Sequence, residues 1–154
     1  MLQTDLERYA NAPAVLVQIY VDRIVLHYPS STEYLTECAQ FSHPRSLLGD
    51  FSIAETTLTQ LLKRGGGGFK YLAPYMFIQA MERMEFGLTQ VEIRALQELG
   101  LNSGARAIAI YDETGRLLTP NSLPAPINLK RIAIMGLIVA SIVLLCFLCA
   151  IFIF

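Results

Sequence analysis

An uncharged run of 23 residues, 132–154, constrains what this chain can fold into more than any other feature. The 12 Lys and Arg and the 13 Asp and Glu of the 154-residue chain all lie at or before Arg131. As a helix rising about 1.5 Å per residue, the run would reach about 34 Å, enough to cross a hydrocarbon core about 30 Å thick. We therefore expect residues 132–154 to form one transmembrane helix that anchors the chain by its tail. A buried core helix is the alternative.

The residues on either side of the start of this run predict the orientation of the chain in the membrane and a contact with another membrane helix. Lys130 and Arg131 directly precede the run and no charge follows them, so the positive-inside rule places the N-terminal domain in the cytoplasm. Gly136 and Ala140 have the small-xxx-small spacing at which another membrane helix can approach closely, although both residues are also common in such helices. Three cysteines in all fit a reducing compartment.

The first half of the domain has two β-rich runs, 14–20 and 23–28, separated by two residues, which predicts a tight hairpin. A polar connection is expected over 29–43. Ser52 and Glu55 have the spacing of a capping box, and apolar residues then recur at helical intervals up to the glycines at 65–68.

The second half repeats a strand-then-helix pattern. Residues 71–79 are mostly apolar and indicate a central strand. Thr89 and Glu92 form a second capping-box pattern, Gly100 is a candidate helix stop, and 107–111 is a further buried strand. The order predicts an α/β domain over 1–118, with a mixed sheet whose central strands are parallel and which is flanked by helices. Residues 119–131, with three prolines, are expected to be a spacer.

The stretch 43–111 resembles the first half of bacterial rod-shape-determining actins of the MreB type. The resemblance rests on Asp50-Phe51 at a helix start, on the apolar strand 71–79, on the helix TQVEIRALQE (89–98) and on the turn NSGAR (102–106). It implies a single actin-like (RNase H-like) lobe at a bacterial inner membrane.

The departures from that family bear on activity. Actin-like ATPases have an Asp-x-Gly phosphate loop in the first hairpin turn, whereas the turn here, 18–23, contains no glycine. The second lobe, which completes the ATP cleft in the family, has no counterpart after residue 111. The resemblance therefore implies a domain that binds no nucleotide, needs no cofactor and is not an enzyme.

Other motifs for chemistry are weak. The run GGGGFK (65–70) lacks the Gly-Lys-Ser/Thr order of a P-loop. His27 and His43, the only histidines, have no ligand-spaced neighbours, so no metal is expected. A net charge of −1 gives no basic field for nucleic acid. Glu82 and Glu85 could act as paired carboxylates, but a solvated loop face is the competing interpretation.

The preferred function is a non-catalytic, membrane-anchored scaffolding protein that recruits or stabilises a bacterial inner-membrane assembly, such as cell-shape or envelope machinery or a secretion or pilus platform. Its partners would be that protein complex and the lipid bilayer, and association with further copies of the chain is considered too. Met81, Met84 and Phe86 are the candidate partner-binding residues, with packing into the core as the alternative. Two other hypotheses are an accessory subunit bound mainly through its membrane helix and a degenerate nucleotide hydrolase.

Overall fold

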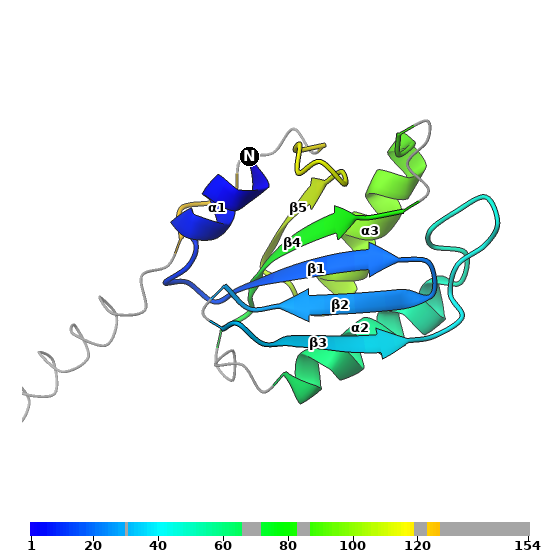
Figure 1. Ribbon diagram of the computed structural model, residues 1–154, viewed down its shortest axis with the longest axis horizontal. Helices are drawn as coiled ribbons and strands as arrows, with labels where there is room; N and C mark the ends of the chain where they lie inside the picture. Colours follow the sequence, from blue (N-terminus) through cyan, green and yellow to red (C-terminus); the bar gives the residue numbers. More distant parts are fainter. Residues whose placement is uncertain (30, 66–71, 83–86, 119–122, 127–154) are drawn as a thin grey trace, which may run out of the picture.

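The computed structural model describes residues 1–29, 31–65, 72–82, 87–118 and 123–126. The elements in chain order are α1 (Leu2–Arg8), β1 (Ala14–Tyr20), β2 (Arg23–His27), β3 (Tyr34–Cys38), α2 (Phe51–Arg64), β4 (Tyr75–Ala80), α3 (Gln90–Asn102) and β5 (Ala107–Tyr111). Figure 1 shows the strands side by side in one sheet, with α2 and α3 behind it.

The sheet is mixed, with the strand order β3-β2-β1-β4-β5. β1 is antiparallel to β2, and β2 to β3, whereas β4 is parallel to both β1 and β5. The two-residue turn Val21-Asp22 closes the first hairpin between Tyr20 and Arg23. Asp22 adopts a φ of 53° there, a left-handed conformation that aspartate tolerates better than most residues. The hairpin and the parallel central strands agree with the sequence analysis.

Helices α2 and α3 cover one face of the sheet and enclose the first core. Their buried side chains are Ala54, Leu58, Leu61, Ile93, Leu96 and Leu99, and they pack on the strand residues Val15, Val17, Ile19, Ile24, Leu26, Met76, Ile78 and Ile110. The strand residues alternate along each strand, because successive side chains of a strand point to opposite faces. On this face, the side chains of β1, β2, β4 and β5 are therefore largely used by the core.

The ends of the two helices differ from the sequence expectation in detail. Asp50, rather than Ser52, caps α2, since its Oδ1 accepts the Ile53 N–H at 3.0 Å. The Thr89–Glu92 capping box of α3 is confirmed. Gly100 does not stop α3, which continues to Asn102. A Cβ at Gly100 would lie 2.7 Å from the Ile108 Cδ1, so the glycine allows close packing of α3 on β5.

Helix α1, which the sequence analysis did not predict, lies on the opposite face and forms a second core. The ring of the fully buried Tyr9 lies 4.7 Å from that of Tyr75 and 5.4 Å from that of Phe77. The Tyr9 hydroxyl donates to the Pro124 carbonyl oxygen, and the Tyr75 hydroxyl donates to the Ala125 carbonyl oxygen at 3.1 Å. Part of the predicted spacer 119–131 is thus held against the domain.

Two strands differ from prediction. β3 lies within the stretch 29–43 that was expected to be a polar connection. β4 begins at Tyr75, directly after Pro74, rather than at residue 71, which lies outside the described residues. Because a proline cannot donate to a sheet, the strand start after Pro74 has a direct physical reason.

The predicted fold class, an actin-like lobe followed by a transmembrane helix, requires a correction. Within the described ranges no helix is both long and apolar enough to cross a membrane, and α2, with 14 residues, is the longest of them. These ranges contain a small mixed α/β domain with a five-stranded sheet and three helices. The segment 132–154, on which the membrane prediction rested, lies outside the described residues.

Candidate interaction surface

On the second face of the sheet α1 packs over β4, β5 and the start of β1, and among the described helices none packs over β2, β3 and the end of β1 (Figure 1). The register of the strands arranges nine side chains in three rows across the sheet. We call these nine residues the uncovered array: Leu16, His27 and Tyr34 in the first row, Gln18, Val25 and Thr36 in the second, and Tyr20, Arg23 and Cys38 in the third. Their strand neighbours point into the first core, so these nine point away from α2 and α3.

The uncovered array is poor in charge. Arg23 is its one charged residue, and the Arg23 guanidinium lies over the Tyr20 ring at 4.1 Å from the ring centroid. Tyr34 exposes 64% of its surface. Protein interfaces are enriched in tyrosine and arginine and depleted in lysine and acidic residues. The composition of this face is therefore typical of a surface that contacts another protein.

Hydrogen bonds fix the polar side chains in the middle of this face. The Gln18 amide nitrogen donates to the Gln79 Oε1 at 3.0 Å, and the Gln18 Oε1 accepts from the His27 Nε2 at 3.1 Å. The Gln79 amide nitrogen donates to the carbonyl oxygens of Asp112 and Glu113, both at 3.2 Å. This chain of contacts from β2 to the end of β5 holds each side chain in one orientation, so the surface is preorganised for binding.

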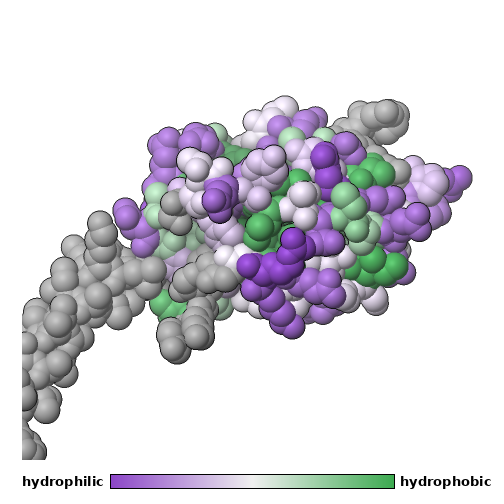
Figure 2. Space-filling view, turned by 60° about the horizontal axis from the view of Figure 1, so that its bottom comes forward, coloured by the Kyte–Doolittle hydropathy of each residue, from purple (hydrophilic) through white to green (hydrophobic). Residues whose placement is uncertain are grey.

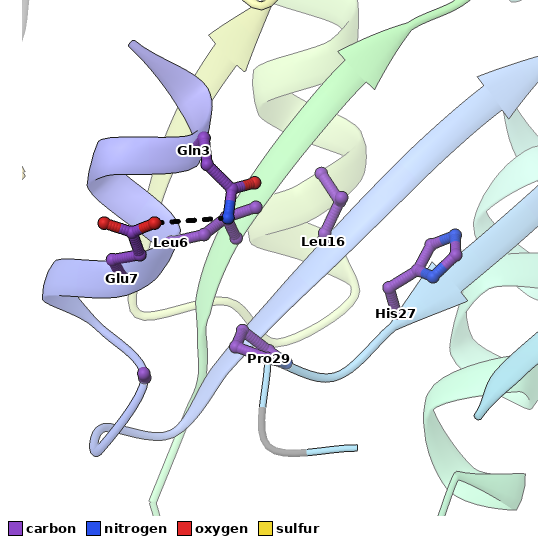
Figure 3. Close-up of a pocket in the computed structure, with 7 residues that line it drawn as sticks. Gln3, Leu6, Glu7, Leu16, His27 and Pro29 are labelled. Carbon is purple, nitrogen blue, oxygen red and sulfur yellow. Dashed lines mark hydrogen bonds between the residues drawn. The ribbon is translucent and has the colours of Figure 1, made fainter. Parts of the chain in front are cut away.

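A pocket of about 160 Å³ lies where the uncovered array meets α1. Its lining residues are Gln3, Leu6, Glu7, Ala10, Leu16, His27 and Pro29. In Figure 3 the α1 side chains Gln3, Leu6 and Glu7 face Leu16, His27 and Pro29 across this space. Burial lowers the pKa of His27 below its ordinary value, so the imidazole is neutral at pH 7. The pocket suits a small uncharged group, such as one apolar side chain of a partner.

Acidic side chains beside the array are engaged by backbone groups. The Asp22 Oδ1 accepts the N–H groups of Phe41 and Ser42 at 3.0 and 2.7 Å. The Glu82 Oε2 accepts the Val21 N–H at 2.7 Å, which gives this member of the predicted carboxylate pair a structural role. Glu85, the other member, lies outside the described residues. Across the described part of the chain, no three His, Cys, Asp or Glu side chains come together as a metal site.

The structure describes only one of the residues that the sequence analysis selected for binding. Met81 is half-buried, and its sulfur lies 3.7 Å from the Gln18 amide nitrogen, next to the array. The other selected residues lie outside the described ranges: Met84, Phe86, Lys130, Arg131, Gly136 and Ala140. The role proposed for Met81, Met84 and Phe86 stays a prediction.

Sequence reasoning missed the array because it missed β3. A strand signal was present in Tyr34, Leu35 and Thr36, which all favour strands. Glu37 interrupts this signal, because it lies on the sheet face that α2 and α3 cover, where an alternating strand pattern would have an apolar residue. There it forms an ion pair with Arg64 of α2. A charged side chain is tolerated at residue 37 because β3 is at the edge of the sheet.

Comparison with known proteins returns no match to any family model and none to a curated protein. It lends no support to interpreting the domain as an MreB-type or actin-like lobe.

Proposed function

We propose that this protein is a non-catalytic interaction module that recruits or holds a protein assembly through the uncovered array. The observation that carries this proposal is a charge-poor aromatic and polar surface, built on three hydrogen-bonded strands, which α2 and α3 do not contact and which α1 borders only at Leu16 and His27. A rigid surface of this kind loses little conformational entropy when a partner binds.

The array also indicates the chemistry of the partner. Tyr34 offers a large exposed ring, and Thr36 and the Gln18–His27 pair offer neutral hydrogen-bonding groups. Figure 2, with the β3 edge turned forward, shows hydrophobic areas separated by hydrophilic ones. A matching partner would present apolar or aromatic side chains together with neutral polar groups, and an acidic group near Arg23.

The non-catalytic part of the proposal is supported by how the polar groups near the array are used. The carboxylates of Asp22 and Glu82 accept backbone N–H groups, and the Nε2 of His27 is bonded to Gln18. General acid or base catalysis needs a titratable group that reaches a substrate proton at a suitable pKa. These contacts instead hold loops and side chains in place.

The location stays a prediction: the cytoplasmic face of a membrane, in contact with lipid and with a membrane protein complex. It rests on the uncharged run 132–154 and on Lys130 and Arg131 before it. Cell fractionation tests it, because the full-length chain should be recovered with membranes and resist extraction by carbonate. Recovery in the soluble fraction would overturn this location.

Co-purification with a matched pair of variants tests the function. Tyr34→Ala removes the most exposed ring of the array, and Val91→Ala removes a side chain that is 79% exposed on α3. We expect mass spectrometry to identify a protein that co-purifies with the wild type and with Val91→Ala but not with Tyr34→Ala. Recovery of the same proteins with all three chains would contradict the proposal.

A further inference from the structure

The outer edge of β3 presents backbone groups whose direction follows from the register of its neighbours. The Ala39 N–H donates to the Asp22 carbonyl oxygen at 3.0 Å, so residues 22 and 39 are a hydrogen-bonded pair. Such pairs alternate along antiparallel strands, which makes Ile24–Glu37 and Leu26–Leu35 the next ones. The N–H and C=O groups of Tyr34, Thr36 and Cys38 therefore point outward, away from β2.

These outward groups form a template for another strand. Among the described residues, the backbones of Tyr34, Thr36 and Cys38 have no hydrogen bond to another segment beyond β3. Natural edge strands are commonly protected by lysine, proline, a bulge or an inward-pointing charge, and of these β3 has only the last. Its one charged side chain, Glu37, is turned toward Arg64 of α2.

The sequence of β3 is complementary to itself in one antiparallel register. With Thr36 opposite Thr36 of a second copy, Tyr34 faces Cys38 and Leu35 faces Glu37, so no like charges are opposed and all five strand residues are paired. Moving the centre by one residue to Leu35 would place Glu33 opposite Glu37, and moving it to Glu37 would oppose two glutamates. Like charges directly opposite each other destabilise a strand pair, so charge selects the Thr36 register.

We propose that two copies of this chain associate through β3, antiparallel and centred on Thr36, and so form one continuous ten-stranded sheet. The two uncovered arrays then adjoin on the same face, because the strand pairing continues the pleat from one copy to the other. This association goes beyond the proposed function, since it concerns the edge of the sheet and a second copy of the chain rather than another protein.

Disulfide cross-linking of the full-length chain tests the register. In a background with Cys146→Ala and Cys149→Ala, Tyr34→Cys introduces a thiol opposite Cys38 of the other copy. Thr36→Cys with Cys38→Ser places two introduced thiols opposite each other. Directly opposed residues have Cα atoms about 5.5 Å apart, within the range that a disulfide spans. The two native Cys38 residues would be about 14 Å apart, too far to form one.

We expect mild oxidation to give covalent dimers with Tyr34→Cys and with Thr36→Cys. The parent with Cys38 alone should give none, nor should Thr4→Cys with Cys38→Ser, which places its thiol on the exposed side of α1. Cross-linking of the two edge variants no faster than that of Thr4→Cys would overturn the proposal. Equal cross-linking by Cys38 alone would overturn the register.

A charge variant gives a second, independent readout. Thr36→Lys would oppose two lysines only when β3 pairs with itself, so sedimentation should show loss of the dimer, whereas Thr4→Lys should keep it. Melting curves followed by circular dichroism verify that both variants fold. A dimer that persists in folded Thr36→Lys would contradict the β3 interface. Tyr34→Ala retains the β3 backbone and should keep the dimer while losing the partner, which separates this proposal from the proposed function.

Discussion

Asp112 organises the turn after β5 with a single buried carboxylate. Its Oδ1 accepts the N–H groups of Thr114 and Arg116 at 3.0 and 2.8 Å, and its Oδ2 accepts the Arg116 Nε–H at 3.1 Å. Burial alone would raise the pKa of Asp112, but the hydrogen bonds from Thr114 and Arg116 outweigh it and lower the pKa below its ordinary value. Gly115 closes this turn at a φ of 78°, and its N–H donates to the Asp112 carbonyl oxygen.

Replacing this carboxylate should have a pH-dependent effect on stability. We expect Asp112→Asn to lower the free energy of unfolding by about 1–2 kcal/mol at pH 7, because an amide oxygen accepts weaker hydrogen bonds than a carboxylate. A carboxylate with a lowered folded-state pKa stabilises the fold above its unfolded pKa of about 4, and this contribution is lost as the pH falls through the folded-state value. The difference between the two proteins should therefore be smaller at pH 3 than at pH 7.

Urea unfolding of the wild type and Asp112→Asn at both pH values measures that difference. A destabilisation that is as large at pH 3 as at pH 7 would show that the carboxylate charge is not its source.

Among the elements, those with a regular pattern were predictable and those held by distant contacts were not. β1, β5 and the start of α3 follow directly from β-branched runs and a capping box. α1 is short and mostly polar, and its stabilising contact is that of Tyr9 with Tyr75 and Phe77, more than 60 residues away along the chain. No local pattern in the sequence reports such a contact.

The N-cap of α2 can be tested by substitution at Asp50, with Ser52 as the matched control. Asp50→Ala should lower the free energy of unfolding by about 0.5–2 kcal/mol, because the Ile53 N–H loses its acceptor. Ser52→Ala, at the position that the sequence indicated as the cap, should change it by less than about 0.5 kcal/mol, since Ser52 is exposed within the helix. Thermal unfolding followed by circular dichroism compares the two variants. A larger effect at Ser52 than at Asp50 would place the cap where the sequence had suggested.

For the whole molecule, the candidate site was the least predictable feature. The uncovered array exists because β3 extends the sheet at one edge, whereas α1 packs toward the other edge, over β4, β5 and the start of β1. The sequence analysis predicted neither β3 nor α1, and it therefore assigned the binding residues to the segment that follows β4. Met81 is the one described residue that was predicted to bind a partner, and it lies next to the array because its sulfur contacts the Gln18 amide nitrogen.

The absence of nucleotide binding is a prediction for the whole chain. The turn of the first hairpin, Val21-Asp22, has no glycine that would let a phosphate approach the backbone closely, and Asp22 already accepts the N–H groups of Phe41 and Ser42. Titration calorimetry of the full-length protein with ATP and Mg²⁺ should give no saturable heat. Saturable binding with a micromolar Kd, equivalent to about 8 kcal/mol, would contradict this expectation.

The most direct test of the interaction surface is photo-cross-linking in living cells, with a photoreactive phenylalanine in place of Tyr34 or, as the control, Val91. Both side chains are exposed, but only Tyr34 belongs to the uncovered array. The account predicts that the chain labelled at position 34 forms an adduct with a different protein and that the chain labelled at position 91 does not. Adducts with the same proteins from both positions, or an adduct at position 34 with a second copy of the chain alone, would contradict it.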